Sequence, residues 1–356
     1  MHMADALVSP AVAVTMYAAS AAAAGVSLVQ LHKEEAAAPE LAKKKLPTMA
    51  VMSALVFAGQ MINYTIPGTG SSGHLCGGML LSAILGPWAG FLSMIVILAI
   101  QALFFADGGL LALGANVWNM AFYGCFVGYF LIYRPLMQGR LLAGKGRTKL
   151  VLASVLGCVV TLQLGALSVV VETSLSGITA LPFGAFAALM QPIHLAIGLV
   201  EGGITAAVLL FVYQTRPELL QCASAGAKNR CSRRAALAIL AAAALVIGGG
   251  LSLLASANPD GLEWSLFGNE EAGYSANMGL DEEAYGAESA AAEKAAAVQE
   301  KTSLLPDYSF AGSDSAAGTS VSGLVGCALV AALAAIISLA GRAARKKSGK
   351  KQASAG

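Results

Sequence analysis

The chain has 356 residues, of which 57% are hydrophobic and only 12% are Asp, Glu, Lys or Arg. Soluble domains average about 25% charged residues, so the composition argues against an ordinary soluble protein and indicates a lipid bilayer. The formal net charge of +2 says little by itself, and no nucleic-acid partner is predicted.

Nine segments are predicted as membrane-spanning helices, and two of the nine are short. Crossing the hydrocarbon core takes about 20 apolar residues. The nine segments are residues 10–31, 47–65, 74–86, 89–106, 116–133, 150–172, 185–213, 235–255 and 322–341. The protein is therefore predicted to be an all-α, multi-pass protein of the cell membrane.

The basic residues set the predicted topology. Of the 22 Lys and Arg residues, 20 lie in four stretches: 33–45, 134–149, 216–234 and 342–351. Positive residues favour the cytoplasmic side, and all four stretches face it only if the apolar run 74–106 crosses twice. The breaker Gly86-Pro87-Trp88 marks the division. The N-terminus is then outside and the C-terminus is cytoplasmic.

This topology predicts two membrane domains. Residues 1–215 form a seven-helix domain, and a cytoplasmic linker, 216–234, joins it to a two-helix hairpin at 235–341. The hairpin carries an outside loop, 256–320, with 12 of the 20 acidic residues. The middle of this loop is predicted to be flexible, with a local helix within 282–301. Residues 342–356 form a basic cytoplasmic tail that can meet anionic lipid.

One nucleotide-binding pattern is a false match. Gly139 to Lys145 matches the GxxxxGK part of a phosphate-binding loop, but Gly146 replaces the Ser or Thr that would hold magnesium. The chain is therefore predicted to contain no ATPase, and any ATP-driven step needs another subunit.

Four histidines occur, and the topology places His2 and His74 on the outer side. The Met1 amine, the His2 amide nitrogen and a His2 ring nitrogen can form a planar chelate, which a nitrogen of His74 would complete. A square of nitrogens favours Ni(II) or Cu(II). Asp5 could orient His2 or cap the first helix. For His194, which lies seven residues before Glu201, a structural or coupling contact is favoured over a ligand role.

These residues bring a family resemblance into view. Residues 1–215 resemble the substrate-specific membrane component of nickel/cobalt energy-coupling-factor (ECF) transporters, the NikM/CbiM type. The resemblance rests on these motifs: Met1-His2-Met3 with Asp5, Ser72-Gly73-His74-Leu75, Leu85-Gly86-Pro87-Trp88, Gln101-Ala102-Leu103, Asp107-Gly108-Gly109-Leu110 and Leu113-Gly114-Ala115-Asn116. Residues 235–341 resemble the small NikN/CbiN-type component, which carries Pro259-Asp260-Gly261-Leu262-Glu263-Trp264.

The resemblance implies a transporter subunit and not an enzyme. Met1, His2 and His74 would be the metal ligands. A transmembrane coupling (T) subunit and cytoplasmic ATP-binding-cassette ATPases would complete the transporter, and no organic cofactor is implied. Support or loading roles fall to Asp5 and, in the small component's motif, to Pro259, Asp260, Glu263 and Trp264.

The form Ser-Gly-His-Leu around His74 resembles the nickel branch of this family, and this resemblance favours nickel over cobalt. The stretch Met3-Ala4-Asp5-Ala6-Leu7 departs from the usual Ile-Pro-Asp-Gly-Phe/Tyr, which leaves the cobalt uptake component as the alternative. A membrane enzyme is less favoured, because Glu172 and Glu201 are the only acids within the predicted spans. A vitamin-binding ECF component is less favoured, because aromatic residues make up only 7% of the chain and the N-terminal chelate would have no purpose.

Overall fold

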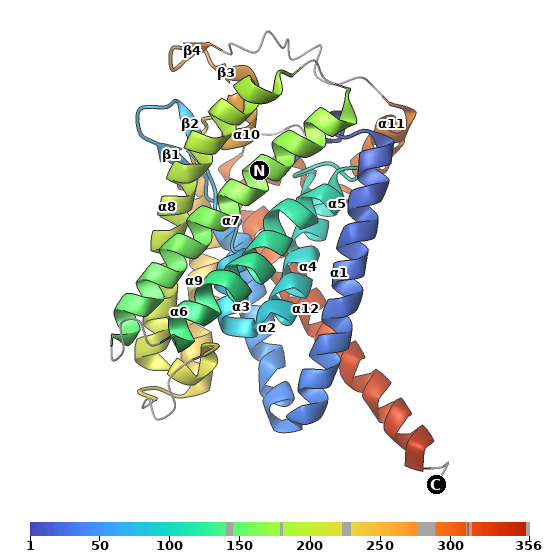
Figure 1. Cartoon of the computed structure of the whole chain (residues 1–356), viewed down its shortest axis with the longest axis vertical. Coiled ribbons are helices and arrows are strands. Elements are labelled where there is room, and N and C mark those ends of the chain that lie inside the picture. The colour runs from blue at the N-terminus through green and yellow to red at the C-terminus, as the bar shows by residue number, and fades with distance from the viewer. Residues whose placement is uncertain are drawn as a thin grey trace.

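The computed structural model describes residues 1–139, 145–178, 181–222, 229–275, 289–310, 312 and 315–353. It is a bundle of long helices packed side by side, with its short strands toward one end (Figure 1). The longer helices are α1 (Pro10–Ala37), α2 (Pro39–Gln60), α4 (Pro87–Phe105), α7 (Gly146–Ser176), α8 (Phe183–Thr215), α9 (Arg233–Gly249) and α12 (Ala316–Ala353). Between α4 and α7, α5 (Leu113–Asn116) continues through the π-helix η2 (Val117–Tyr133) into α6 (Arg134–Gln138).

Six of the described helices are long and apolar enough to cross a bilayer. They are Pro10–Ala37, Pro87–Phe105, Leu113–Gln138, Gly146–Ser176, Phe183–Thr215 and Ala316–Ile336. Among the other predicted spans, α2 begins with charged residues and α9 has 17 residues. The multi-pass helical architecture is therefore as predicted, while the number of spans stays a prediction.

The predicted basic loop at 33–45 is largely helical, which corrects the sequence-based boundary. Helix α1 runs to Ala37 and α2 begins at Pro39, so Ala38 alone separates them. Proline is well suited to the first position of a helix because its missing N–H would be unpaired there. Hydropathy marks only the apolar part of each helix, and these two extend beyond it.

The predicted break at Gly86 is confirmed. Gly86 has φ of +86°, a conformation that favours glycine, and it separates α3 (Gly78–Leu85) from α4. However, α3 has only eight residues, or about 12 Å at 1.5 Å per residue, so residues 74–86 do not form a helical span.

An extended segment replaces the missing helix before α3. Strand β1 (Tyr64–Ile66) pairs antiparallel with β2 (Ser71–Gly73), and the chain then runs inward without helical structure as far as α3. The Glu201 carboxylate accepts hydrogen bonds from the amides of Cys76 and Gly77, both at 2.9 Å. Non-helical backbone is tolerated at membrane depth when protein groups satisfy it, and Glu201 does so here.

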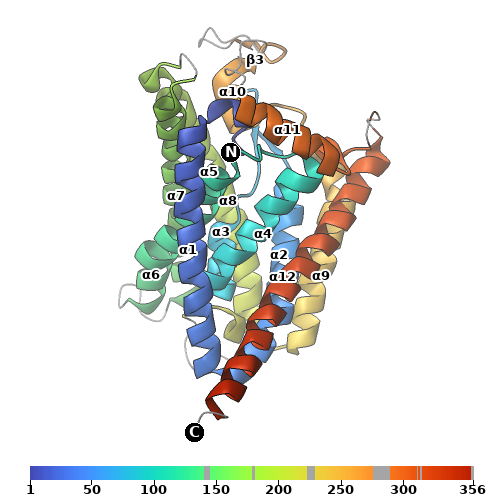
Figure 2. The same cartoon turned by 90° about the vertical axis from the view of Figure 1, so that its right-hand side faces the viewer.

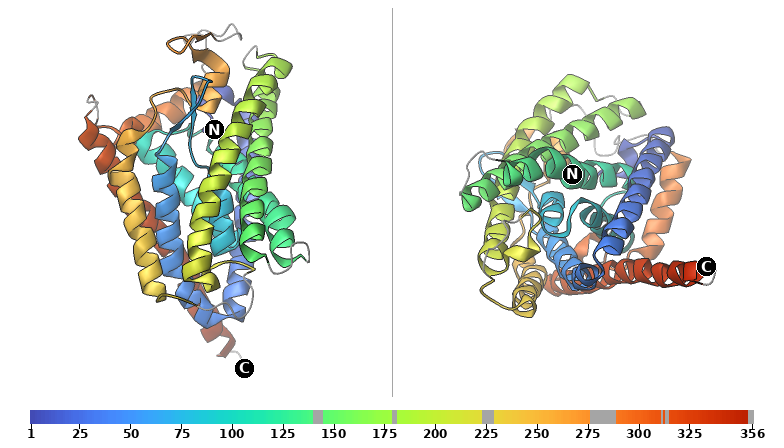
Figure 3. Two further views of the ribbon diagram at one scale, coloured as in Figure 1. Left: turned by 90° about the vertical axis from the view of Figure 1, so that its left-hand side faces the viewer. Right: turned by 60° about the horizontal axis from the view of Figure 1, so that its bottom comes forward.

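The C-terminal helices α9 and α12 pack against each other and against α2 (Figures 2 and 3). Their close approach needs small residues, because a Cβ atom on Gly323 would lie 1.9 Å from the carbonyl oxygen of Gly248. The 3₁₀ helix η3 (Pro217–Leu219) precedes α9. The chain between α9 and α12 forms the 3₁₀ helices η4 (Leu251–Leu254) and η6 (Pro306–Tyr308), helices α10 (Gly261–Phe267) and α11 (Ala290–Thr302), and strands β3 (Gly268–Asn269) and β4 (Tyr274–Ser275).

The described part of the predicted outside loop is folded over one end of the bundle (Figure 1). Helix α11 confirms a local helix in its region, and the Ser289 side chain caps it by accepting from the Ala292 amide. Residues 276–288, where flexibility is predicted, lie outside the described residues. So do residues 140–144 of the false nucleotide motif, 223–228 of the linker and 354–356 of the tail.

Candidate metal centre

The first residues of the chain lie inside the bundle, close to the end that carries α10 (Figure 2). Met1 is 6% exposed and Met3 is fully buried. The Asn116 side chain holds Met3 on both sides: its Oδ1 accepts from the Met3 amide at 2.7 Å, and its Nδ2 donates to the Met3 carbonyl at 3.1 Å. The Gly109 amide also donates to that carbonyl, at 2.9 Å. These bonds fix the N-terminus as they would fix a short strand.

Asp5 anchors this segment to the loop that follows α4. Its Oδ1 accepts from the Ala112 amide at 3.0 Å, and burial raises the pKa of Asp5 against the opposing effect of the loop amides. Ser9, and not Asp5, caps α1 through the Val12 amide. A Cβ on Gly109 would lie 1.8 Å from Asp5 Oδ1, so only glycine leaves room for this contact.

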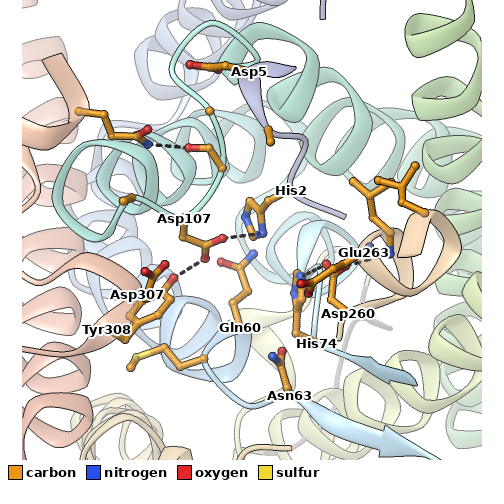
Figure 4. A pocket seen from close by; sticks show the side chains of 18 of the residues that line it. His2, Asp5, Gln60, Asn63, His74, Asp107, Asp260, Glu263, Asp307 and Tyr308 are labelled. Carbon is orange, nitrogen blue, oxygen red and sulfur yellow. Dashed lines mark hydrogen bonds and ion pairs between the residues drawn. The ribbon is translucent and has the colours of Figure 1, made fainter. Parts of the chain in front are cut away.

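The Met1 amine lies beside His74. Its nitrogen is 3.3 Å from His74 Nε2, although 73 positions separate the residues. The amine also donates to Asp260 Oδ2 at 2.9 Å, and the same oxygen is 4.0 Å from His74 Nε2. Three elements therefore meet here: the N-terminus, the extended segment before α3 and the start of α10 (Figure 4).

The His2 ring stacks on that of His74, with 5.1 Å between the ring centroids and 20° between the planes. Its Nδ1 lies 3.2 Å from Asp107 Oδ1 and its Nε2 lies 3.3 Å from Gln101 Oε1. Tyr308 links these two partners of His2. Its hydroxyl donates to Asp107 Oδ2 at 2.5 Å and accepts from Gln101 Nε2 at 3.2 Å. Gln101, Asp107 and Tyr308 are called the His2 clamp below.

Burial lowers the pKa of His2, and the Asp107 carboxylate only partly opposes this. A lowered pKa favours the neutral imidazole, which is the form that binds a metal ion.

Asp260 is held where α10 begins. Its Oδ1 accepts from the amides of Leu262 and Glu263, at 2.9 and 2.8 Å, which makes it the helix cap. The Pro259 carbonyl accepts from the Ser72 amide at 2.8 Å, so the predicted motif is seated on β2. Burial acts to raise the pKa of Asp260, but the Met1 amine, His74 and the amide donors outweigh it and lower the pKa.

The other two predicted motif residues differ in position. Glu263 lines a cavity together with His2 and His74. Trp264 packs edge-on against Tyr274, with 6.3 Å between the ring centroids. The Trp264 amide donates to the Asp260 carbonyl at 2.8 Å, but among the described residues its side chain is not part of the cavity lining.

A cavity of about 600 Å³ opens beside these groups. Its polar lining includes five carboxylates and no Lys or Arg: Asp5, Asp107, Asp260, Glu263 and Asp307. No three His, Cys, Asp or Glu side chains among the described residues are arranged to hold a metal ion by themselves. The Met1 amine, 3.3 Å from His74 Nε2, is a nitrogen donor of another kind at this place.

The available nitrogens fit a square arrangement in part. Two neighbouring donors in a square, each about 2.0 Å from the ion, lie about 2.8 Å apart, and the Met1 and His74 nitrogens are 3.3 Å apart. The chelate ring through the His2 amide uses Nδ1, which contacts Asp107 here. To bind a metal ion through these nitrogens, His2 would have to leave its clamp and the amine would have to leave Asp260.

The sequence-based site did not include the clamp residues. In the sequence, Gln101 and Asp107 stand out only as parts of family motifs. Tyr308 lies 201 positions from Asp107, so no local pattern joins them. A glutamine inside an apolar span is a signal of function and could have identified Gln101.

Comparison with known proteins decides the family. Residues 2–219 match the sequence model of the cobalt uptake substrate-specific transmembrane region, CbiM, and residues 234–343 match the PDGLE domain. The chain belongs to the CbiM family. It is thus a component of nickel/cobalt transport, and components of this family work in transporter complexes.

Relatives match along most of the chain. A protein of Archaeoglobus fulgidus with the provisional name fused nickel transport protein NikMN is 33% identical over 342 residues, covering 94% of this chain and 96% of its own. The cobalt transport protein CbiM of Sorangium cellulosum is 36% identical over 174 residues, 49% of this chain and 76% of its own. The crystal structure of a truncated transition metal transporter is 35% identical, with a TM-score of 0.50, covering 60% of this chain and 98% of its own.

Proposed function

We propose that this CbiM-family chain is the substrate-binding component of an ATP-driven nickel importer, which captures Ni(II) through the Met1 amine, His2 and His74. The observation that carries the proposal is the position of the Met1 amine, buried and 3.3 Å from His74 Nε2. A charged chain terminus is normally exposed, because burying an unpaired charge is costly. Here Asp260 pairs with the charged amine, and the Nε2 nitrogen of His74 lies beside it.

The donor set gives the metal preference. The Met1 amine, the His2 amide nitrogen and His2 Nδ1 close two fused rings, and His74 Nε2 supplies the fourth nitrogen. Square-planar nitrogen donors suit Ni(II) or Cu(II), whereas oxygen-rich octahedral sites suit Mg(II) or Ca(II), and the likeness to the fused nickel transport protein of Archaeoglobus fulgidus favours Ni(II). Cobalt uptake is the alternative, supported by the likeness to the CbiM of Sorangium cellulosum.

The chain's own residues act in sequence. The acid-lined cavity attracts the divalent cation to the site. The Met1 amine leaves Asp260 and His2 leaves Asp107, so each carboxylate gives up a positive or hydrogen-bonded partner as the ion arrives. The segment Pro259 to Glu263 then serves as a loading device, because it ties the state of the amine to the position of α10.

The orientation follows the basic residues. The N-terminus and α10 face outward, and the C-terminus, at the opposite end of the bundle (Figure 3), is cytoplasmic, as the positive-inside rule predicts. A transmembrane coupling (T) subunit and cytoplasmic ATP-binding-cassette ATPases supply the energy in this proposal.

The ligand assignment is tested by Ni(II) titration of the purified full chain. His2→Ala and His74→Ala each remove one of the four proposed nitrogens, and each is expected to weaken binding at least 100-fold. His32→Ala, an exposed histidine on α1, is the matched control and should bind as the original protein does. Unchanged affinity in His74→Ala would exclude the proposed fourth ligand, and a stronger preference for Co(II) in competition would favour the alternative.

A further inference from the structure

A third histidine faces the metal centre and has no role in the function proposed above. His194 lies on α8 and is 1% exposed. Its Nδ1 is 2.8 Å from the Met190 carbonyl, one turn earlier in the helix, so Nδ1 carries the hydrogen and donates. The lone pair is therefore on Nε2, which has no hydrogen-bond partner among the described residues.

His194 shares a small cavity with the metal-binding groups. Met1, His74, Cys76, Asp260 and His194 line a space of about 10 Å³. A space of this size holds about one water-sized body, so it admits a bare cation and excludes an organic ligand.

The two histidines of this cavity are oriented in the same way. His74 Nδ1 lies 3.1 Å from the Leu75 carbonyl, which leaves its Nε2 toward the Met1 amine. Metal-binding histidines usually donate one ring N–H to a carbonyl, which fixes the other nitrogen toward the ion. His194 has this arrangement, with the second nitrogen unused.

Helix α8 also fixes the distance between the two histidines. Ile197, less than one turn after His194, fills the space beside Gly73, where a Cβ atom would lie 2.5 Å from its side chain. Gly261 of α10 leaves room for the His194 ring, since a Cβ there would lie 3.1 Å from His194 Cε1. His194 is therefore held between the His74 segment and α10.

We propose that His194 Nε2 is a transient fifth ligand, which takes up the transported cation as it leaves the Met1–His2–His74 set. This inference rests on the proposed function. A square of four nitrogens leaves the ion open above and below the plane, so a fifth lone pair can enter before another ligand departs. The new bond joins the ion and His194 Nε2, and the bond to the His2 amide nitrogen breaks. That nitrogen takes a proton from water, and the oxidation state of the ion does not change.

The test separates exchange rate from equilibrium affinity in the purified full chain. Ni(II) release into excess EDTA is followed by stopped-flow absorbance for the original protein, His194→Ala and the control His32→Ala. His194→Ala should bind Ni(II) with a Kd within threefold of the original value but release it at least tenfold more slowly. Added imidazole, which can enter the space left by the ring, should restore fast release.

Three results would overturn the inference. They are an unchanged release rate in His194→Ala, a slow rate that imidazole does not restore, and a tenfold loss of equilibrium affinity. If His194→Ala does not fold, His194→Gln takes its place, because an amide is a poor nickel ligand of similar size. Failure of the proposed function is separate, since it would appear as unchanged affinity in His2→Ala.

Discussion

The Met1 amine donates to Asp260 Oδ2 at 2.9 Å, across 259 positions of sequence. Met1 directly precedes residues 2–219, the part of the chain that matches CbiM, and Asp260 lies in the part that matches the PDGLE domain. One ion pair thus joins the two family regions at the metal centre. The arrangement makes the second region part of the site and not only an accessory to the bundle.

Changing Asp260→Asn should lower the stability of the metal-free protein. Breaking a buried pair typically costs roughly 3–5 kcal/mol, and about 2 kcal/mol is expected here because the Asp260 side chain is 22% exposed. Thermal unfolding should show a lower Tm. Glu293→Gln, an exposed acid on α11, is the control.

The loss of stability in Asp260→Asn should become smaller in acid. The folded-state pKa of Asp260 is lowered, below an unfolded value of about 3.9. Its stabilisation is therefore fully present above that value and is lost as the pH falls through the folded-state pKa. The Tm difference between the variant and the original protein should be constant from pH 5 to pH 6.5. A difference that grew across this range would contradict the assigned pair.

Tyr308→Phe should tighten nickel binding. The change keeps the ring that stacks on Phe105, 4.9 Å between centroids, but it removes the hydroxyl contacts to Asp107 and Gln101. These contacts hold His2 in a state that metal binding must leave. Losing about 1 kcal/mol of hydrogen bonding from the free state corresponds to roughly fivefold tighter binding. Equilibrium titration measures this, with Tyr274→Phe as the control, and weaker binding would show that the clamp assists chelation.

Gly109→Ala should weaken nickel binding at least tenfold by displacing the N-terminus. The new Cβ would lie 1.8 Å from Asp5 Oδ1 and 2.5 Å from the Asp5 backbone nitrogen, so the segment that carries Met1 and His2 must shift. Gly203→Ala is the matched control, because a Cβ on Gly203 has no atom within 4 Å among the neighbours considered. Equal affinities in the two variants would mean that the position of the N-terminus does not govern binding.

Local sequence signals predicted part of this architecture. The break at Gly86-Pro87 and the helical apolar segments follow from hydropathy and turn residues. The meeting of Met1, His2 and His74 followed from chelate chemistry combined with topology, and the structure places all three together.

Other features depend on contacts between distant residues. The segment before α3 is extended because Glu201, 125 positions later, binds the Cys76 amide, and no local pattern contains that information. The clamp on His2 likewise needs Tyr308, which lies 201 positions after Asp107 in the chain.

The central claim is that the free N-terminal amine binds the metal ion, and moving the amine tests it most directly. A single residue added before Met1 would itself create a chelate of amine, two amides and histidine, so three residues, Met-Ser-Gly, should be added instead. Calorimetric titration with Ni(II) compares this variant with the original chain, and circular dichroism checks its fold. At least a 100-fold loss of affinity in a folded variant is predicted, whereas unchanged affinity would contradict the account.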